Sequence, residues 1–447
     1  MRWTMQIARI TLNCLRRTQF IPVSLLLLAA CSDGASPSEQ TGVPPGKQAE
    51  VPRQVISFTG DELGRESLNR YGSLEDTIQT LRAYRPLDLN AEVWKKANPG
   101  RQYQEWAQLA RDRVETGLHY EPGPVDLRAK TLARIETDSF IREKIEFNTT
   151  PWFRVPGYFY IPKNVPLPAP GLVVLHAWGG PMLFGTDRIC GEPVHEAVVR
   201  HRDKVYSGRA LADWFASNGY AVIVIDAYHF GSRAPRGLNG LPESYDPAQL
   251  DEATLDQYNT LTRELLYLGV RQLNWAGTTW AGVNYTDDSR CVDYLLSREE
   301  VDGTRLGVTG LSGGGWRTNI VAALEPRIKA AVSVGWMTTG DTQQPYNVAG
   351  AIGTFCLLPG VWNRLDIPDL IAMAAPKACM VVNATEDLLF PPLGQREAAR
   401  QIAAAFEWAG CREKFKNYTP SKPHCYDREI QEEALDWFDQ HLKQPGQ

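Results

Sequence analysis

The sequence predicts an α/β fold: a mostly parallel sheet with helices on both faces, preceded by an N-terminal helical extension. Over residues 140–447, short apolar stretches rich in β-branched residues alternate with stretches of helical periodicity. Such alternation indicates parallel strands, because a parallel pair needs a long crossover connection that is usually a helix. With 447 residues, 43% of them hydrophobic and 22% charged, the chain can bury a core of this size.

The expected elements follow one another along the chain. Two antiparallel strands come first, because FIREKIEF and GYFYIP flank the turn-like NTTPWFRVP. Six further strands are expected at GLVVLHA, YAVIVIDA, RLGVTG, KAAVSVG, ACMVVNA and KFKNYTP. The helices are expected at GRALADWFASNG, DDSRCVDYLLSRE, WRTNIVAALE, LGQREAARQIAAAFEWAG and REIQEEALDWFDQHL. Ligands of such sheets bind at the carboxyl ends of the strands, so catalytic residues are sought there.

Two segments lie directly in front of this sheet. Residues 55–139 predict the helical extension, since SLEDTIQTLRAY and RQYQEWAQLARDRVETGL both place apolar residues on one helical face. The first of these helices begins with a capping pattern at Ser73 and Asp76. Residues 31–54, rich in proline, glycine and serine, predict a flexible tether. Neither segment carries a pattern of catalytic residues, so the helical extension is expected to be a cap or a packing element.

The first thirty residues predict an export signal. Four arginines and no acidic residue accompany the apolar run FIPVSLLLLAA, which is too short to span a bilayer as a helix. The sequence LAAC, ending at Cys31, resembles the processing site of bacterial lipoproteins, in which this cysteine is lipidated. The resemblance implies a lipid anchor in the bacterial cell envelope, and Ser32 implies sorting to the periplasmic side of the outer membrane. An uncleaved apolar anchor is the alternative.

Composition argues against nucleic acid and metal ions as partners. The formal net charge is −5 and no basic run is present, which excludes the usual electrostatic footprint of a nucleic-acid-binding protein. None of the eight cysteines forms a C-x-x-C pair, and H-E-x-x-H is absent from the sequence. No metal or other cofactor is therefore expected. The spacing assigns no disulfides, and Cys379, within the apolar ACMVV, is expected to be a buried thiol.

A candidate nucleophile stands in RLGVTGLSGGGWRT, residues 305–318. Ser312 lies between a predicted strand and a predicted helix, with Gly310 and Gly314 completing the pattern G-x-S-x-G. Strand, sharp turn and helix around this pattern predict a nucleophile elbow, which exposes the serine at the edge of the sheet. The alternative is a glycine-rich loop that only lets a helix pack closely on the sheet.

A serine nucleophile needs a base and an acid that orients the base, and the chain offers both. His424 follows the last predicted strand and precedes the last predicted helix. Glu386 and Asp387 lie in the polar loop after ACMVV. The order serine, acid, histidine along the chain is that of the α/β-hydrolase fold. His229 is the alternative base to test, and Asp226 is the alternative acid.

From residue 140 to 442 the chain resembles the dienelactone-hydrolase and acetyl-xylan-esterase-like group of α/β hydrolases. The matching segments are HAWGGP, GYAVIVIDAYHFGSR, EVDGTRLGVTGLSGGG, NATEDLLFPP and PHCYDREIQEEALDWF. In that group the acid stands three residues before the phenylalanine of D-x-x-F-P. The resemblance therefore implies a catalytic triad of Ser312, Asp387 and His424, with Asp387 favoured over Glu386.

Two backbone amides are expected to bind the oxyanion of the tetrahedral intermediate. The first belongs to Gly313, the residue after the nucleophile, at the start of a helix. The resemblance implies that the second comes from the loop after His176, either from Trp178 or from Ala177. In that group a glycine usually follows this histidine, whereas here Ala177 does. His176 itself is expected to be structural.

These residues predict a serine carboxylesterase that needs no cofactor and acts on a small-molecule or carbohydrate ester, for instance as a carbohydrate deacetylase. A peptidase or thioesterase on the same fold and a non-catalytic binding lipoprotein are the alternatives. The sequence does not name the substrate. Residues 340–366 are expected to form a rim loop around the pocket. Five tryptophans near the expected site either stack on substrate or fill the core: Trp178, Trp275, Trp280, Trp316 and Trp336.

Overall fold

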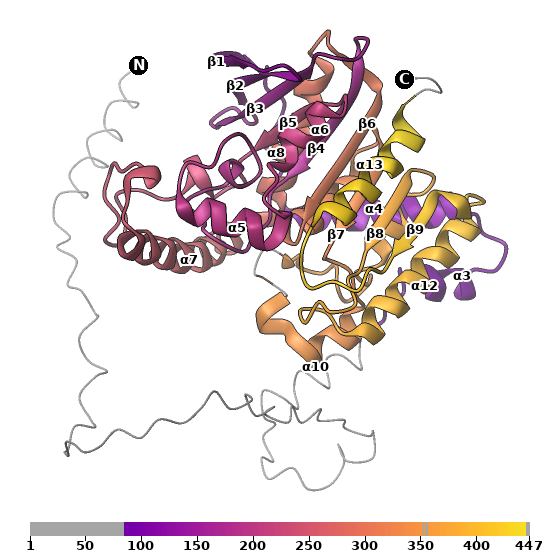
Figure 1. The fold of residues 1–447 in the computed structure, drawn as a ribbon. Helices are drawn as coiled ribbons and strands as arrows, with labels where there is room; N and C mark the ends of the chain where they lie inside the picture. Colours follow the sequence, from indigo (N-terminus) through magenta and orange to yellow (C-terminus); the bar gives the residue numbers. More distant parts are fainter. Residues whose placement is uncertain (1–84, 352, 354–355, 444–447) are drawn as a thin grey trace, which may run out of the picture. The chain divides into compact units, whose positions relative to one another are not determined.

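The computed structural model describes residues 85–443 apart from 352, 354 and 355, and all of these belong to one compact unit (Figure 1). A nine-stranded sheet lies at its centre. Its strands are β1 (Lys130–Glu136), β2 (Phe140–Asn148), β3 (Arg154–Pro162), β4 (Ala169–Leu175), β5 (Ala221–Ile225), β6 (Val301–Leu311), β7 (Ile328–Val334), β8 (Ala378–Val382) and β9 (Phe415–Tyr418). The predicted signal, Cys31, the tether and the helix at Ser73 lie outside the described residues.

The sheet combines an antiparallel end with a parallel body. Its strand order is β1-β2-β3-β5-β4-β6-β7-β8-β9. The pairs β1–β2, β2–β3 and β3–β5 are antiparallel. The pairs β5–β4, β4–β6, β6–β7, β7–β8 and β8–β9 are parallel. All eight strands predicted from the sequence are present. The carboxyl ends of β6, β7, β8 and β9 consequently lie side by side at one edge, where the candidate residues follow them.

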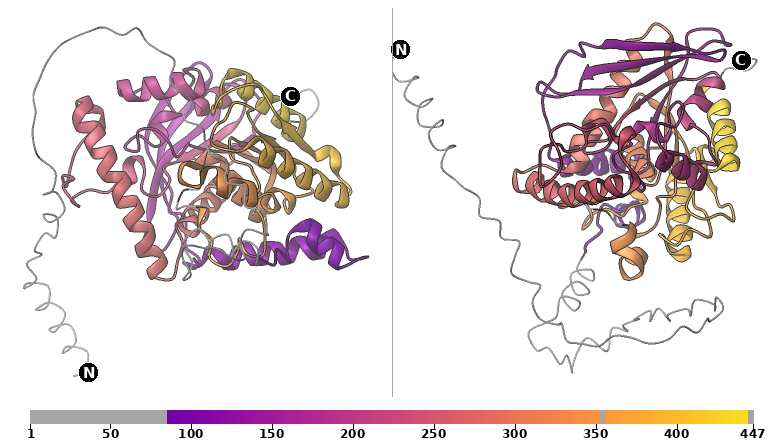
Figure 2. Two further views of the ribbon diagram at one scale, coloured as in Figure 1. Left: turned by 90° about the horizontal axis from the view of Figure 1, so that it is seen from below. Right: turned by 60° about the vertical axis from the view of Figure 1, so that its left-hand side comes forward.

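Helices cover the sheet on both faces (Figure 2). They are α3 (Ala91–Ala97), α4 (Tyr103–Leu118), α5 (Glu196–Tyr206), α6 (Leu211–Ser217), α7 (Glu252–Trp275), α8 (Trp280–Leu296), α9 (Gly313–Leu324), α10 (Gly340–Ala351), α11 (Asp369–Ala372), α12 (Pro392–Trp408) and α13 (Arg428–Leu442). Among the described residues, none of these helices is both long and apolar enough to cross a bilayer.

Two hydrophobic cores explain why the central strands read as continuous apolar runs. In β4, Val173 and Leu175 enter one core, while Leu172 and Val174 enter the other. Side chains of a strand alternate between the two faces, so a strand with both faces covered is apolar at every position. Helices α4, α8, α9 and α12 contribute to the first core, and α6 and α13 contribute to the second.

Four elements differ from the sequence predictions. Residues 130–136, assigned above to the helical extension, form strand β1, and all seven of its residues are exposed. Such an edge strand lacks the apolar alternation by which strands are found in a sequence. Helices α5 and α7 were not predicted. The expected rim loop at 340–366 begins instead with α10, whose helical geometry is interrupted at Asn347.

The N-terminal helices α3 and α4 share the core of the sheet instead of forming a separate cap. Trp106 is completely buried, and its indole N–H donates to the carbonyl of Leu89 over 2.7 Å. The Tyr103 hydroxyl donates to the carbonyl of Ala372 over 2.7 Å. Arg111 donates to the carbonyl of Met373, next to α11. The extension is thus built into the same compact unit as the sheet.

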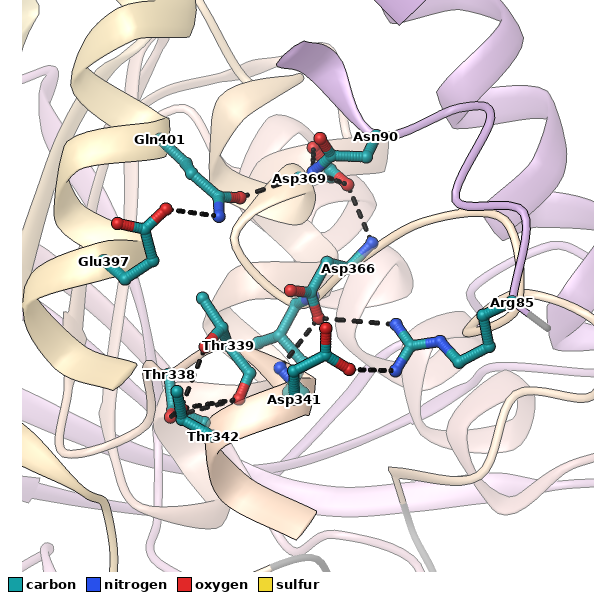
Figure 3. A network of polar contacts seen from close by, with 12 residues as sticks. Arg85, Asn90, Thr338, Thr339, Asp341, Thr342, Asp366, Asp369, Glu397 and Gln401 are labelled. Atoms are coloured by element: carbon teal, nitrogen blue, oxygen red, sulfur yellow. Dashed lines mark hydrogen bonds and ion pairs between the residues drawn. The ribbon is translucent and has the colours of Figure 1, made fainter. Parts of the chain in front are cut away.

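A polar network joins this extension to the loops at the carboxyl edge of the sheet (Figure 3). The Asp369 carboxylate accepts the backbone N–H of Ala91 over 3.0 Å and the Asn90 amide over 3.2 Å. Asp366 accepts the N–H of Gly340 at the start of α10 over 2.8 Å. From α10, the Gln343 amide donates to the carbonyl of Leu389 over 2.9 Å, in the loop that follows β8.

The six cysteines among the described residues are all buried, and none of them forms a disulfide. Cys379 lies in the centre of β8, as predicted.

Candidate active site

Ser312 lies at a strained turn between β6 and α9. Its φ of +58° and ψ of −117° fall in a region that residues with a side chain rarely adopt. The backbone N–H of Ser312 donates to the carbonyl of Val334 at the end of β7 over 2.9 Å. The turn therefore stays attached to the sheet while the half-buried serine side chain is presented at its edge.

The glycines around Ser312 are required by close packing. The positive φ belongs to the serine, and neither Gly310 nor Gly314 has one. A Cβ atom on Gly310 would lie 2.6 Å from the carbonyl oxygen of Leu175, and one on Gly314 would overlap the same oxygen. Their lack of a side chain lets α9 approach β4 and β6 closely. Both sequence interpretations of the glycines therefore apply: the turn is an elbow, and its helix packs tightly on the sheet.

His424 and Asp387 form a hydrogen-bonded pair at the same edge. The Nδ1 atom of His424 lies 2.6 Å from Oδ2 of Asp387, although 37 positions separate the two residues along the chain. The other carboxylate oxygen of Asp387 accepts the backbone N–H of Leu389 over 2.9 Å. The Asp387 side chain is buried, whereas the His424 side chain is 23% exposed. A buried acid that fixes a partly exposed imidazole is the arrangement a general base needs.

The alternative acids and base lie elsewhere. Glu386 is exposed, and its carboxylate accepts the hydroxyl of Ser421. Asp226 accepts the backbone N–H groups of Thr186 and Ser232, and so holds two loops together. His229 lies against the carbonyl of Thr262 on α7. None of the three contacts His424 among the hydrogen bonds and ion pairs of the described residues.

Ser312 and His424 both lie near the end of β7. A Cβ atom on Gly335, which follows β7 directly, would lie 3.0 Å from Cε1 of His424. Val334, the residue before it, receives the N–H of Ser312. Among the described residues the two side chains make no hydrogen bond with one another. Catalytic hydrogen bonds often become short only once substrate is bound.

The loop after β4 brings a second amide toward the start of α9. A Cβ atom on Gly313 would lie 3.1 Å from the backbone nitrogen of Trp178. It would also lie 2.5 Å from the Cβ atom of Trp178, which is closer than van der Waals contact allows. The first amides of a helix have no intrahelical acceptor, so the Gly313 N–H is free to bind an anion. The backbone nitrogen of Trp178 thus lies beside Gly313, the residue that follows Ser312.

Arg188 and His176 support that loop, and no pattern in the sequence indicated a role for Arg188. Both side chains are buried. The Nε2 atom of His176 accepts the N–H of Ala227 over 3.0 Å, and its Nδ1 lies 2.8 Å from the carbonyl oxygen of Ala177. Burial and the neighbouring Arg188 charge lower the pKa of His176 well below its usual value, so the ring is neutral. His176 is structural, as expected.

Most of the five tryptophans fill the core. Trp316 and Trp336 are buried and pack together with 4.5 Å between ring centroids. Trp280 is buried as well, while Trp275 is 95% exposed at the end of α7. Trp178 is half-buried, and its ring packs edge-on against Trp280 at 4.9 Å. Trp178 is the tryptophan at the candidate site.

A cavity of 530 Å³ lies beyond Trp280, between α7 and the loop after β5. Its lining combines apolar side chains of α7 with Tyr228, Arg233 and Gln272. Such mixed lining is common in sites for small polar ligands. Among the described residues, no group of three or more histidine, cysteine, aspartate or glutamate side chains is arranged to hold a metal ion.

Comparisons with known proteins identify relatives with the same fold. The family model Abhydrolase_7, which describes an Abhydrolase family, matches residues 66–424. YtaP of Bacillus subtilis (strain 168), named as a candidate hydrolase, is 22% identical over 309 residues, which cover 69% of this chain and 91% of YtaP.

Two solved structures are similar in the arrangement of their elements. A candidate acetyl xylan esterase from Bacteroides fragilis NCTC 9343 has a TM-score of 0.59 at 16% identity, covering 79% of this chain and 84% of its own. A glucuronoyl esterase from Teredinibacter turnerae T7901 has a TM-score of 0.52 at 15% identity, covering 81% and 90%. At such identities the likeness concerns the fold, and it confirms the α/β-hydrolase fold predicted from the sequence.

Proposed function

We propose, because the chain belongs to the Abhydrolase family, that it is a serine carboxylesterase acting through Ser312, His424 and Asp387. The observation that carries the proposal is the His424–Asp387 pair of 2.6 Å at the sheet edge to which the strained Ser312 turn is attached. A glycine-rich packing loop alone would not require a histidine fixed by a buried acid at the same edge. This pair also favours catalysis over the alternative of a non-catalytic binding protein.

In the proposed reaction, Ser312 Oγ attacks the ester carbonyl carbon while His424 Nε2 takes the serine proton. Asp387 accepts the Nδ1–H of His424, which keeps Nε2 available as the base. His424 then gives the proton to the leaving alcohol, and an acyl-enzyme remains. Water attacks this acyl-enzyme by the same route, with His424 again as the base, and releases the acid.

The oxyanion of each tetrahedral intermediate would be bound by the N–H groups of Gly313 and Trp178. The close approach of Trp178 N to Gly313 supports Trp178 over Ala177 as the second donor. Ala177 is buried at 3% exposure, and the carbonyl of Ala177 that Arg188 binds belongs to the same peptide group as the Trp178 N–H. Donors fixed before the reaction stabilise developing charge without reorganisation, which is commonly a large contribution to catalysis.

We further propose that the substrate is an ester of a carbohydrate. The support comes from the neighbours in fold, which are named as acetyl xylan and glucuronoyl esterases. The cavity beyond Trp280 has an aromatic, polar and cationic lining of the kind that binds small polar ligands. None of Ser312, Asp387 and His424 lines it, and its link to the candidate site is the ring contact of Trp280 with Trp178.

A substrate panel tests this function. The full chain should hydrolyse p-nitrophenyl acetate and release acetate from acetylated xylan, with slower turnover of aminoacyl amides and acyl thioesters. A methyl ester of glucuronic acid separates a uronate esterase from a deacetylase. Faster cleavage of amides or thioesters than of every ester would favour the peptidase or thioesterase alternative. No turnover of any substrate, together with no labelling by a fluorophosphonate, would contradict catalysis altogether.

We also propose that the mature protein is anchored in the bacterial cell envelope by lipid on Cys31, on the periplasmic side of the outer membrane. Support comes from the basic start, the short apolar run and LAAC before a proline- and glycine-rich segment. A lipid anchor beside a carbohydrate esterase would hold the enzyme in the compartment where polymer fragments enter.

Substitution of Cys31 by serine should leave the precursor uncleaved or release the protein from the membrane fraction. The expected result follows because the thiol is the acceptor of the lipid. The measurement is membrane fractionation with mass spectrometry of the mature N-terminus, and Cys14→Ser, which lies inside the signal, serves as the matched control. A Cys31→Ser protein that stays in the membrane fraction with an unchanged N-terminus would rule out the lipoprotein.

A further inference from the structure

Arg188 is a buried arginine whose guanidinium binds backbone carbonyls and contacts the His176 ring. It ends a short 3₁₀ turn, Thr186–Arg188, and has no solvent exposure. Its guanidinium donates to the carbonyl oxygens of Ala177 over 2.7 Å, Gly179 over 2.5 Å and Gly185 over 3.3 Å. Three carbonyls of the segment between β4 and this turn therefore converge on one planar guanidinium, a geometry that a lysine cannot reproduce.

Arg188 makes no direct ion pair among the described residues, and the carboxylates of Asp226 and Asp187 act on its charge only at longer range. The buried Arg317, in contrast, is paired with Asp288. Burial lowers the pKa of the Arg188 guanidinium to about 10, so it still carries a proton at neutral pH. An unpaired buried charge is costly and is seldom kept without a reason, because a neutral side chain could bind carbonyls at a lower cost in desolvation.

Two of the carbonyls held by Arg188 flank Trp178. The carbonyl of Ala177 and the N–H of Trp178 belong to the same peptide group, and this peptide is trans. In a planar trans peptide the C=O and the N–H point in opposite directions. Because Arg188 binds the oxygen on one side, the Trp178 N–H must point away from Arg188, on the side where Gly313 lies.

His176 contributes to the same restraint. Its Nε2 accepts the N–H of Ala227 over 3.0 Å, and its Nδ1 lies 2.8 Å from the Ala177 oxygen and 2.7 Å from a guanidinium nitrogen of Arg188. The neutral ring therefore packs against both the guanidinium of Arg188 and the carbonyl that this guanidinium binds. A cationic donor on this oxygen also polarises the peptide, which strengthens its N–H as a donor.

We propose that Arg188 is a positioning residue that orients and polarises the Trp178 N–H as an oxyanion donor, through the carbonyl of Ala177. The proposal rests on the function proposed above, in which Ser312 forms a tetrahedral oxyanion. Arg188 does not touch substrate. Its effect should therefore appear in the stabilisation of the transition state and leave substrate binding in the ground state nearly unchanged.

The test compares Arg188→Gln and Arg188→Lys with a matched control, Arg111→Gln. Arg111 also binds carbonyl groups, those of Ala323 and Met373, but lies on α4 away from the oxyanion loop. We expect Arg188→Gln to lower kcat on p-nitrophenyl acetate about 10²–10³-fold, the loss seen when one oxyanion donor is removed, with KM changed less than about threefold. Arg188→Lys keeps the positive charge but loses the planar set of guanidinium donors, so a smaller decrease of kcat, about tenfold, is expected.

A second readout separates positioning from folding. Phenylboronic acid forms a tetrahedral anion on a nucleophilic serine, so its affinity should fall in parallel with kcat in both Arg188 variants. Circular dichroism and the stoichiometry of fluorophosphonate labelling give the folded fraction, to which kcat is normalised. Arg111→Gln should keep kcat and boronate affinity within about twofold of the wild type.

The proposal would be overturned by Arg188 variants whose normalised kcat and boronate affinity match the wild type, because their only effect would then be on folding. A rise in KM at constant kcat would also overturn it. If Arg188→Gln does not fold, the Arg188→Lys variant decides by the same criteria. Failure of the proposed function itself is distinguishable, since the wild type would then show neither turnover nor fluorophosphonate labelling, or Ser312→Ala would keep the activity of the wild type.

Discussion

Substitution of Ser312 by alanine is expected to lower kcat for ester hydrolysis by at least about 10⁴-fold. The alanine removes only Oγ, the atom proposed to attack the carbonyl carbon. The folded structure should be retained, because Ser312 Oγ makes no hydrogen bond within the described residues and the turn is held by the backbone N–H of Ser312. Thermal unfolding and steady-state kinetics measure the two effects separately.

Ser333→Ala is a matched control for this change. Ser333 lies on the neighbouring strand β7, is completely buried, and donates to the carbonyl of Gly315 over 3.1 Å. Its replacement should reduce stability by about 1 kcal/mol through the lost hydrogen bond, while the normalised kcat is preserved. A fluorophosphonate should label this control and the wild type. Full labelling of Ser312→Ala would show that the nucleophile is another residue.

Asp387→Asn should lower kcat by about 10³–10⁴-fold, and the hydrogen bonds of Asp387 explain why. One carboxylate oxygen accepts the N–H of Leu389, and the other faces Nδ1 of His424. In the asparagine variant, the amide oxygen is expected to stay with the Leu389 N–H, which leaves the amide NH₂ group facing His424. Nδ1 must then accept, the ring proton moves to Nε2, and the base can no longer take the serine proton.

Glu386→Gln supplies the comparison within the same loop. Glu386 is exposed and accepts a hydrogen bond from Ser421. The kcat of the Glu386→Gln variant should therefore stay within about twofold of the wild type. Steady-state kinetics of the two variants, with circular dichroism for the fold, make the measurement. Small and equal losses would mean that the acid is another residue. Asp226 would be the next candidate, although its carboxylate already binds Thr186 and Ser232.

The central sheet was predictable because both of its faces are covered. Every residue of β4, β5 and β8 is buried, so these strands appear in the sequence as uninterrupted apolar runs. These strands alternate with helices along the chain, and crossovers between parallel strands are right-handed. Together the two facts leave few possible orders of the strands in the sheet. The edge strand β1 has no buried residue and so carries no such signal. Its pairing with β2 depends on backbone hydrogen bonds that composition does not reveal.

At the candidate site, the sequence revealed residue types and their chain order but not their contacts. Ser312, Asp387 and His424 could be selected because each follows its own strand. The role of Arg188 could not be predicted, because it binds carbonyl groups, which every residue has. The strain at Ser312 was likewise hidden: G-x-S-x-G suggested that glycine relieves the bend, whereas the positive φ falls on the serine itself.

The strand order has a consequence for how the chain folds. Leu172 of β4 pairs with Gly307 of β6, so more than a hundred residues must be made before one side of β4 finds its neighbour. Contacts between such distant segments form slowly, because a long loop must first be closed. Until then β4, which is apolar on both faces, presents an unpaired edge that can add strands from other molecules. The newly made chain therefore needs protection of this edge before β6 arrives, a demand that a sheet of sequential hairpins would not make.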